Sequence, residues 1–143
     1  MGSSTVIVLD THIWVWWVDG NAQLTAECLN YVERQQANGL GVSIISCWEV
    51  AKLIEYDRLQ LECSVEEWLE MALAYPGIRL LNLTPGISVE STKLPGPFHK
   101  DPADQIIVAT ARLWNCPLLT ADDRILKYPH VQLARCSDEV EQA

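Results

Sequence analysis

Short apolar runs alternate with longer amphipathic stretches along the chain. Residues 5–9 and 41–45 are rich in β-branched side chains and lack polar alternation, which is typical of strands buried on both faces. Residues 78–83 and 118–120 predict two further strands, and residues 131–134 a fifth. The first of these runs ends abruptly in an acidic residue, so the pattern predicts a short buried strand there.

Helix signals lie between the predicted strands. Ser46 with Glu49, and Ser64 with Glu67, have the S-x-x-E spacing of a capping box, which satisfies free backbone groups at a helix start. Pro102 suits the first position of the most strongly periodic stretch. We therefore expect helices over residues 25–37, 46–56, 64–74 and 101–114, with a short helix starting at residue 85.

Alternating strands and helices indicate a parallel sheet of about five strands with helices on both faces, a three-layer α/β/α fold. A tryptophan-rich segment at 13–18 leads into a turn at 19–21 and is assigned to neither a strand nor a helix. The length and the 49% of apolar residues are those of one domain, so we expect a single domain over residues 1–143 with its core in about 5–134.

Acidic side chains follow or flank several of the predicted strand ends. Asp10 ends the first strand, Glu49 lies in the helix after the second, Asp101 and Asp104 open the helix before the fourth, and Asp122 follows the fourth. Because the carboxyl ends of parallel strands share one edge of a sheet, we expect these acids to lie close together. Crowded carboxylates repel each other, and a hard divalent cation such as Mg²⁺ or Mn²⁺ relieves this repulsion. Such an ion also makes a bound water nucleophilic and clamps phosphoryl oxygens, which favours phosphodiester hydrolysis.

Each of these acids also has a structural alternative. Asp10 could be a turn residue, and Glu49 could serve only as a capping-box partner. Asp101 is well placed to cap its helix, Asp104 to complement the helix dipole, and Asp122 to open a last short helix. Their joint placement near equivalent strand ends favours the functional interpretation.

The charge balance is acidic, with a formal net charge of −9 and a pI near 4.6. A protein that binds nucleic acid by general phosphate neutralisation would be basic, so this composition opposes that class. It is compatible with a site for cations or with a basic partner. Lys100 and Arg124 flank acidic positions and could contact phosphates, although both could equally be solvated surface residues.

Cysteine and histidine spacing argues against a disulfide framework and against a zinc site. The five cysteines are Cys28, Cys47, Cys63, Cys116 and Cys136. Their odd number and the lack of a C-x-x-C motif predict isolated, inert thiols. His12, His99 and His130 lie far apart in the chain. With neither a signal peptide nor a transmembrane stretch in the sequence, we expect a cytoplasmic protein without membrane contact.

Four segments together resemble the successive motifs of VapC-type toxins of the PIN-domain family. They are Leu-Asp-Thr-His-Ile-Trp at 9–14, Ser-Cys-Trp-Glu-Val-Ala at 46–51, His-Lys-Asp-Pro-Ala-Asp-Gln-Ile-Ile-Val-Ala at 99–109 and Leu-Thr-Ala-Asp-Asp-Arg-Ile at 119–125. The Leu-Pro-Gly loop at 94–96 also fits this subgroup. The similarity runs from about residue 6 to residue 134, and its specificity comes from the order and spacing of the motifs.

The resemblance implies a PIN fold with a five-stranded parallel sheet and an acidic pocket that holds Mg²⁺ or Mn²⁺. Asp10, Glu49, Asp104 and Asp122 match the family's four catalytic acids, and Asp101 matches an additional acid of this subgroup that can act as a metal ligand. The implied activity is endoribonucleolytic cleavage of RNA, such as tRNA or rRNA, by the toxin of a VapBC toxin–antitoxin pair. The implied partners are a second copy in a homodimer and a VapB-like antitoxin that lays a segment into the active-site groove.

Gln105 departs from the family pattern, in which a basic residue is frequent at this position, and Ala103 stands where a larger apolar residue is usual. Neither change removes an acid, so we expect the metal site to be retained. Two alternatives stay open. One is a catalytically silent PIN-like binding module, and the other is an aspartyl-phosphate type phosphatase, although His12 stands where such a phosphatase would carry its second Asp.

Overall fold

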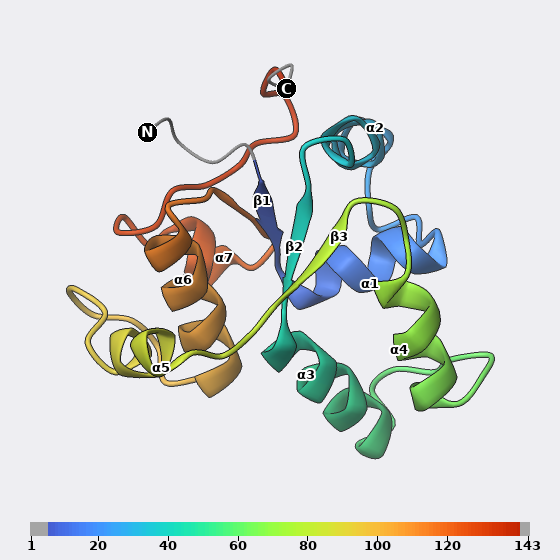
Figure 1. The fold of residues 1–143 in the computed structure, drawn as a ribbon, viewed down its shortest axis with the longest axis horizontal. Helices are drawn as coiled ribbons and strands as arrows, with labels where there is room; N and C mark the ends of the chain where they lie inside the picture. Colours follow the sequence, from blue (N-terminus) through green and yellow to red (C-terminus); the bar gives the residue numbers. More distant parts are fainter. Residues whose placement is uncertain (1–5, 141–143) are drawn as a thin grey trace.

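The computed structural model of the chain describes residues 6–140. Its central sheet is parallel and consists of β1 (Ile7–Leu9), β2 (Leu40–Ser43), β3 (Ile78–Leu81) and β4 (Leu118–Leu119), in the order β3-β2-β1-β4 (Figure 1). The predicted α/β fold with a parallel sheet is therefore confirmed. The predicted start of the first strand, Thr5, lies outside the described residues.

The predicted fifth strand, at 131–134, is reduced to one parallel bridge between Leu118 and Leu133. Two backbone hydrogen bonds make this bridge, from Leu118 N to Gln132 O and from Ala134 N to Leu118 O. Because β4 has only two residues, it offers too short an edge for a longer ladder. The described part of the chain thus has a sheet of four strands where about five were expected.

Helices cover both faces of the sheet, as the alternation predicted. α1, α2 and α4 lie over one face and α6 and α7 over the other, while α5 packs on α6 and α3 extends from the carboxyl edge of the sheet (Figure 1). The helices are α1 Thr11–Asp19, α2 Ala26–Gln35, α3 Ile44–Glu55, α4 Val65–Leu73, α5 Pro85–Ser91, α6 Pro102–Trp114 and α7 Asp123–Leu126.

The side chains of β1 alternate between two hydrophobic cores. Ile7 and Leu9 pack under α1, α2 and α4, whereas Val6 and Val8 pack under α6 and α7. All four are almost completely buried. A strand buried on both faces needs no polar alternation, which explains why residues 5–9 form one apolar run.

Most of the predicted helix starts are confirmed. Ser64 Oγ accepts a hydrogen bond from Glu67 N, as a capping box requires. Asp101 caps α6, with Pro102 at its first position. Asp122 caps α7, so that acid does open a last short helix.

The start of α3 was predicted wrongly. The helix begins at Ile44 and is capped by Ser43, whose hydroxyl accepts from Ile45 N. Ser46 therefore lies inside the helix and is fully buried, so it does not cap it. The apolar pair at 44–45 looked like the end of a strand, because a short apolar run fits a strand and a buried helix turn equally well.

The tryptophan-rich segment, unassigned from the sequence, is helix α1. It begins directly after Asp10 and ends at Gly20, which adopts the left-handed conformation that suits a helix C-cap. Trp14 and Trp17 are buried in the core, and Trp16 is half-buried. Because most of α1 is enclosed, its sequence lacks the polar face that marks an amphipathic helix.

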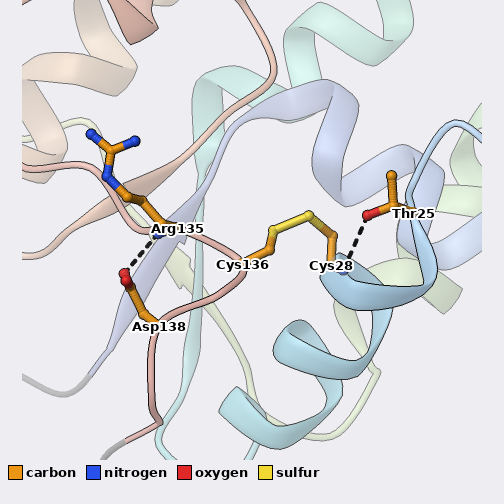
Figure 2. The surroundings of a disulfide bond; sticks show 5 residues. All are labelled: Thr25, Cys28, Arg135, Cys136 and Asp138. Atoms are coloured by element: carbon orange, nitrogen blue, oxygen red, sulfur yellow. Dashed lines mark hydrogen bonds between the residues drawn. A yellow bond between two sulfur atoms is a disulfide. The ribbon is translucent and has the colours of Figure 1, made fainter.

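Cys28 and Cys136 form a disulfide, so the prediction of isolated thiols was wrong for these two residues. Figure 2 shows the bond joining the first turn of α2 to the C-terminal segment, with Cα atoms 4.8 Å apart. Thr25 caps α2 at this point by accepting from Cys28 N, and Arg135 N donates to Asp138 Oδ2 in the turn beside Cys136. Cys47, Cys63 and Cys116 are free thiols.

In the described residues, no helix combines the length and the apolar character that crossing a membrane requires. The longest helix, α6, has 13 residues, and a membrane-spanning helix needs about 20.

Candidate active site

Asp10 lies at the carboxyl end of β1, where the chain turns into α1. Its Oδ1 accepts from Thr11 N at 2.9 Å, and its Oδ2 accepts from Thr120 Oγ1 at 2.6 Å. Because Thr120 directly follows β4, the neighbouring strand holds this carboxylate in place. Asp10 is only 6% exposed, and its burial raises its pKa above the ordinary value. It is thus both the cap of α1 and a fixed carboxylate at the sheet edge.

Glu49 reaches the same edge from the second turn of α3. The Thr11 hydroxyl donates to Glu49 Oε1 at 2.5 Å, and the hydroxyls of Thr11 and Ser46 are hydrogen-bonded at 2.8 Å. The expected capping-box role of Glu49 is therefore wrong, because its carboxylate points to α1 and not to the start of its own helix. Burial, followed by the charges of Asp10 and Asp101, raises the pKa of Glu49.

Asp101 and Asp104 lie at the start of α6, close to Asp10 and Glu49. Asp101 Oδ1 accepts from the backbone N–H groups of Ala103 and Asp104, at 3.0 and 3.2 Å, so its structural role as a cap is present. Asp104 is almost completely buried, and its Oδ2 lies 3.1 Å from Nε2 of His99. Since Nδ1 of His99 accepts from Asp101 N, the proton of the neutral ring lies on Nε2, which makes no hydrogen bond within the described residues.

Arg124 joins two of the acids. Its Nη2 lies 3.2 Å from Asp122 Oδ2 and 3.5 Å from Asp104 Oδ2. Partial burial raises the pKa of Asp122, but hydrogen bonds from the backbone and side chain of Arg124 outweigh this and lower it below the ordinary value. Burial and the Arg124 charge also lower the pKa of His99.

All five predicted acids share one electrostatic environment. Burial, followed by the charges of Asp10, Asp101, Glu49 and Asp122, raises the pKa of Asp104 from 3.8 to about 8. A carboxyl group perturbed to this extent by its neighbours is a frequent property of functional sites. The structure therefore brings together the residues that the strand ends predicted, with Asp104 at the centre of their mutual repulsion.

The donor set has the chemistry that a hard divalent cation prefers, because its potential ligands are carboxylate oxygens. Burial is the largest cause of the raised pKa values of Asp10, Glu49 and Asp104, and neighbouring carboxylates add to it, so a bound cation would favour the ionised form of each. Within residues 6–140, however, no three carboxylate, imidazole or thiolate side chains are already grouped to hold an ion. The donor chemistry thus fits, whereas the side chains are arranged around Arg124 and the two threonine hydroxyls.

Three supporting residues at the site were missed from the sequence. Thr11 and Thr120 orient Asp10 and Glu49, and His99 lies against Asp104. Thr120 carried a usable signal, because it is the first polar residue after a buried strand. His12, next to Asp10 in sequence, is exposed, and its ring lies 5.9 Å from that of Trp16.

Comparison with known proteins places this geometry in a family. The sequence model of the PIN-domain family matches residues 7–131, a range that includes the five acids and every strand of the sheet. The chain belongs to the PIN-domain family. A curated relative, the ribonuclease VapC22 of Mycobacterium tuberculosis, is 33% identical over 126 residues, covering 88% of this chain and 94% of the relative.

Solved structures share the PIN fold at lower sequence identity. VapBC2 from Rickettsia felis, solved with a DNA fragment from its promoter, has a TM-score of 0.66 at 17% identity and covers 90% of this chain and 97% of its own. A toxin–antitoxin complex from Klebsiella pneumoniae has a TM-score of 0.63 at 22% identity, with 93% and 99% covered. FitAcB from Neisseria gonorrhoeae has a TM-score of 0.65 at 18% identity, with 91% and 97% covered. These likenesses confirm the fold of this PIN domain.

Proposed function

We propose that this PIN domain is an Mg²⁺- or Mn²⁺-dependent endoribonuclease and the toxin of a VapBC-type toxin–antitoxin pair. The main support is the cluster of carboxylates around the buried Asp104, where burial and the neighbouring negative charges favour a bound cation. The similarity to a VapC ribonuclease over most of both chains supports RNA as the substrate class. The phosphatase alternative receives no support from any of these comparisons.

Asp10 and Asp104 would be the main ligands of the metal ion, and Glu49 and Asp122 would complete the site. Asp101 would contribute the oxygen that does not cap α6, since Oδ1 accepts both capping bonds. When bound, the cation stabilises the charge on the phosphate oxygens and lowers the pKa of water. The cleavage that we propose leaves a 5′-phosphate and a 3′-hydroxyl.

Thr11 and Thr120 would orient the acids for this chemistry. Each donates its hydroxyl proton to a carboxylate, Thr11 to Glu49 and Thr120 to Asp10, so the remaining carboxylate lone pairs point elsewhere. Positioning of this kind keeps a ligand set in place before the substrate arrives. Arg124, which contacts Asp104 and Asp122, compensates part of the negative charge at the site.

The antitoxin would occupy the groove beside the acid cluster. This groove, of about 700 Å³, lies between α1 and α3 and the loop at 57–60, and His12 is one of its lining residues. His12 follows Asp10 by two residues, so a segment in the groove would end close to the catalytic acids. Asp19 and Asp57 line the groove with one arginine, Arg58, which suits a partner segment with basic character.

A homodimer is supported by exposed apolar side chains on neighbouring elements. Leu80 of β3, Val89 of α5 and Leu113 of α6 are between 43% and 52% exposed. A contiguous apolar patch on a surface commonly marks a protein interface, and we propose that these three side chains belong to one. We also propose a cytoplasmic location, in which a reducing environment would keep Cys28 and Cys136 as thiols. Light scattering after size exclusion, and alkylation of thiols in fresh lysate, test these two points.

The nuclease proposal is tested by incubating total bacterial RNA with the purified protein, in Mg²⁺ or Mn²⁺ and in EDTA. We expect discrete fragments that require the metal and carry 5′-phosphates. Asp10→Asn should abolish cleavage, because Asp10 is a proposed ligand at the centre of the site. Asp123→Asn is the matched control, since it removes the charge of an exposed acid and should cleave like the wild type.

Fragments that persist in EDTA or with Asp10→Asn would contradict the proposed chemistry and indicate a contaminating nuclease. Binding of RNA or of a partner protein without any cleavage, in either metal, would favour the silent binding module instead. Isothermal titration with Mn²⁺ separates these cases further, because the nuclease proposal requires metal binding that Asp104→Asn weakens.

A further inference from the structure

A second pocket adjoins the acid cluster from the side of α6 and α7. It has a volume of about 410 Å³, within the range of about 300–1,000 Å³ that is common for small-ligand sites. Two segments form it, the loop at 97–99 and the segment at 124–130, which contains the end of α7. The pocket is lined by Pro97, Phe98, His99, Arg124, Lys127, Tyr128, Pro129 and His130.

The charge of this pocket is opposite to that of the whole chain. Arg124 and Lys127 are exposed on its wall, and no Asp or Glu is among the described residues that line it. Arg124 already contacts Asp104 and Asp122, whereas Lys127 has no carboxylate partner among the described residues, so Lys127 is the cation of the pocket that is available to an anion. The α1–α3 groove, by contrast, is lined by Asp19 and Asp57.

The same pocket has an aromatic wall. The ring of Phe98 lies 4.4 Å from that of His99 and 4.7 Å from that of Tyr128, and the ring of Tyr128 lies 5.4 Å from that of His130. Tyr128 donates its hydroxyl proton to Pro95 O at 2.6 Å, which fastens the loop to the segment after α7. Phe98 is half-buried and His130 is exposed, so both offer ring surface to a ligand.

Two of the lining residues connect the pocket to the proposed catalytic acids. His99 Nε2 lies 3.1 Å from Asp104 Oδ2, and Arg124 Nη2 lies within 3.5 Å of both Asp104 and Asp122. A group that contacts His99 or Arg124 in the pocket is therefore separated from the proposed catalytic acids by a single side chain. Gln105, which replaces a basic residue in the family pattern, donates to His99 O and supplies no charge to phosphate. The cations for phosphate must then come from another element.

We propose that this pocket holds the RNA nucleotide next to the scissile bond, with its phosphate at Lys127 and Arg124 and its base against Phe98 and His130. The combination of cations for a phosphate with ring faces for a base is how proteins bind single-stranded nucleic acid. The proposal rests on the proposed ribonuclease function, because it takes RNA as the substrate. It makes Lys127 and His130 substrate-binding residues without a role in the chemistry.

The test is RNA binding in the Asp10→Asn background, so that binding is measured without cleavage. The probe is a fluorescein-labelled single-stranded RNA of about 12 nucleotides, within the usual site sizes for such proteins. Lys127→Gln should weaken binding about threefold to tenfold and reduce the slope of log Kd against log salt by about 0.7, the value for one lost phosphate contact. Lys93→Gln is the matched control, because Lys93 is exposed outside the pocket and should bind like its parent.

His130→Ala tests the base contact. The parent should bind the RNA about fivefold more tightly than an abasic strand of the same length, and the variant should lose most of this preference because one stacking face is gone. Circular dichroism and thermal melting establish that each variant is folded. A parent that binds both strands equally, or a variant that keeps the preference, would overturn the assignment of the base site.

The outcomes distinguish this proposal from the function on which it rests. Equal binding by Lys127→Gln and Lys93→Gln, with wild-type protein that still cleaves, would overturn the pocket and leave the nuclease intact. Wild-type protein that never cleaves, with binding that depends on Lys127, would overturn the nuclease and support the pocket. Displacement of the probe by poly-glutamate as effectively as by unlabelled RNA would show that the pocket accepts acidic protein segments, and would overturn its assignment to a nucleotide.

Discussion

Replacing Asp104 by Asn should stabilise the metal-free protein even though it removes a proposed catalytic carboxylate. Asp104 is 5% exposed, and its burial and the charges of Asp10, Asp101, Glu49 and Asp122 raise its pKa from 3.8 to about 8. The unfolded chain releases this proton near pH 4, whereas the folded protein keeps it until about pH 8. The folded state therefore binds the proton more tightly, and the free energy of unfolding falls as the pH rises between the two values.

The size of the effect follows from the difference between the two pKa values. Each pH unit in this window lowers the free energy of unfolding by about 1.4 kcal/mol, so the cost at pH 7 is on the order of 4 kcal/mol. Asn keeps the shape and polarity of the protonated acid but cannot ionise, so the variant avoids this cost.

The assay is urea unfolding followed by tryptophan fluorescence, between about pH 4 and pH 8 in EDTA. The stability of Asp104→Asn relative to the wild type should be close to zero near pH 4 and should increase steadily to pH 8. Asp123→Asn, which removes an exposed charge nearby, should follow the wild-type curve. A difference between Asp104→Asn and wild type that does not change with pH would refute the reasoning, because it would show that Asp104 is not protonated preferentially in the folded state.

Two further predictions concern the stability of the fold. Cys28 and Cys136 are 108 residues apart, so Cys28→Ser should lower the free energy of unfolding by about 4–5 kcal/mol in the chain-entropy account, and an unchanged urea midpoint on adding reductant to the wild type would contradict this. Gly77 has φ of +88°, and an added Cβ would lie 2.4 Å from Gln36 O, so Gly77→Ala should cost about 2 kcal/mol or more in the same assay. Gly20→Ala, at φ +63° in open space, should cost about 1 kcal/mol, and equal losses at both glycines would exclude the clash.

The sheet and the positions of the acids could be predicted because both depend on local patterns. Strands buried on both faces form apolar runs, and a polar residue that ends such a run marks the carboxyl edge of the sheet. Asp10 and Asp122 were found in this way, and the structure places them after adjacent strands. The acids on α3 and α6 could be placed because each lies near the start of a helix that the sequence predicted.

What could not be predicted depends on tertiary contacts. Ser46 with Glu49 has the same spacing as Ser64 with Glu67, yet only Ser64 caps its helix. The two pairs differ in their surroundings, because Ser46 and Glu49 on α3 are hydrogen-bonded to Thr11 on the neighbouring helix α1. The disulfide is a contact of the same kind, since an odd number of cysteines gives no indication of which two residues meet across the fold.

The net negative charge of the chain argues against nucleic-acid binding, but the charges are distributed unevenly over the structure. The acid cluster stands at the carboxyl edge of the sheet, between the α1–α3 groove on one face and the Lys127 pocket on the other. The groove contains carboxylates that suit a basic segment, whereas the pocket contains cations and rings that suit a nucleotide. If both proposals hold, an inhibitor and a substrate would approach the same acids from opposite sides. On this arrangement, a basic partner in the groove would contact His12, two residues from Asp10, without competing for the cations at Arg124 and Lys127.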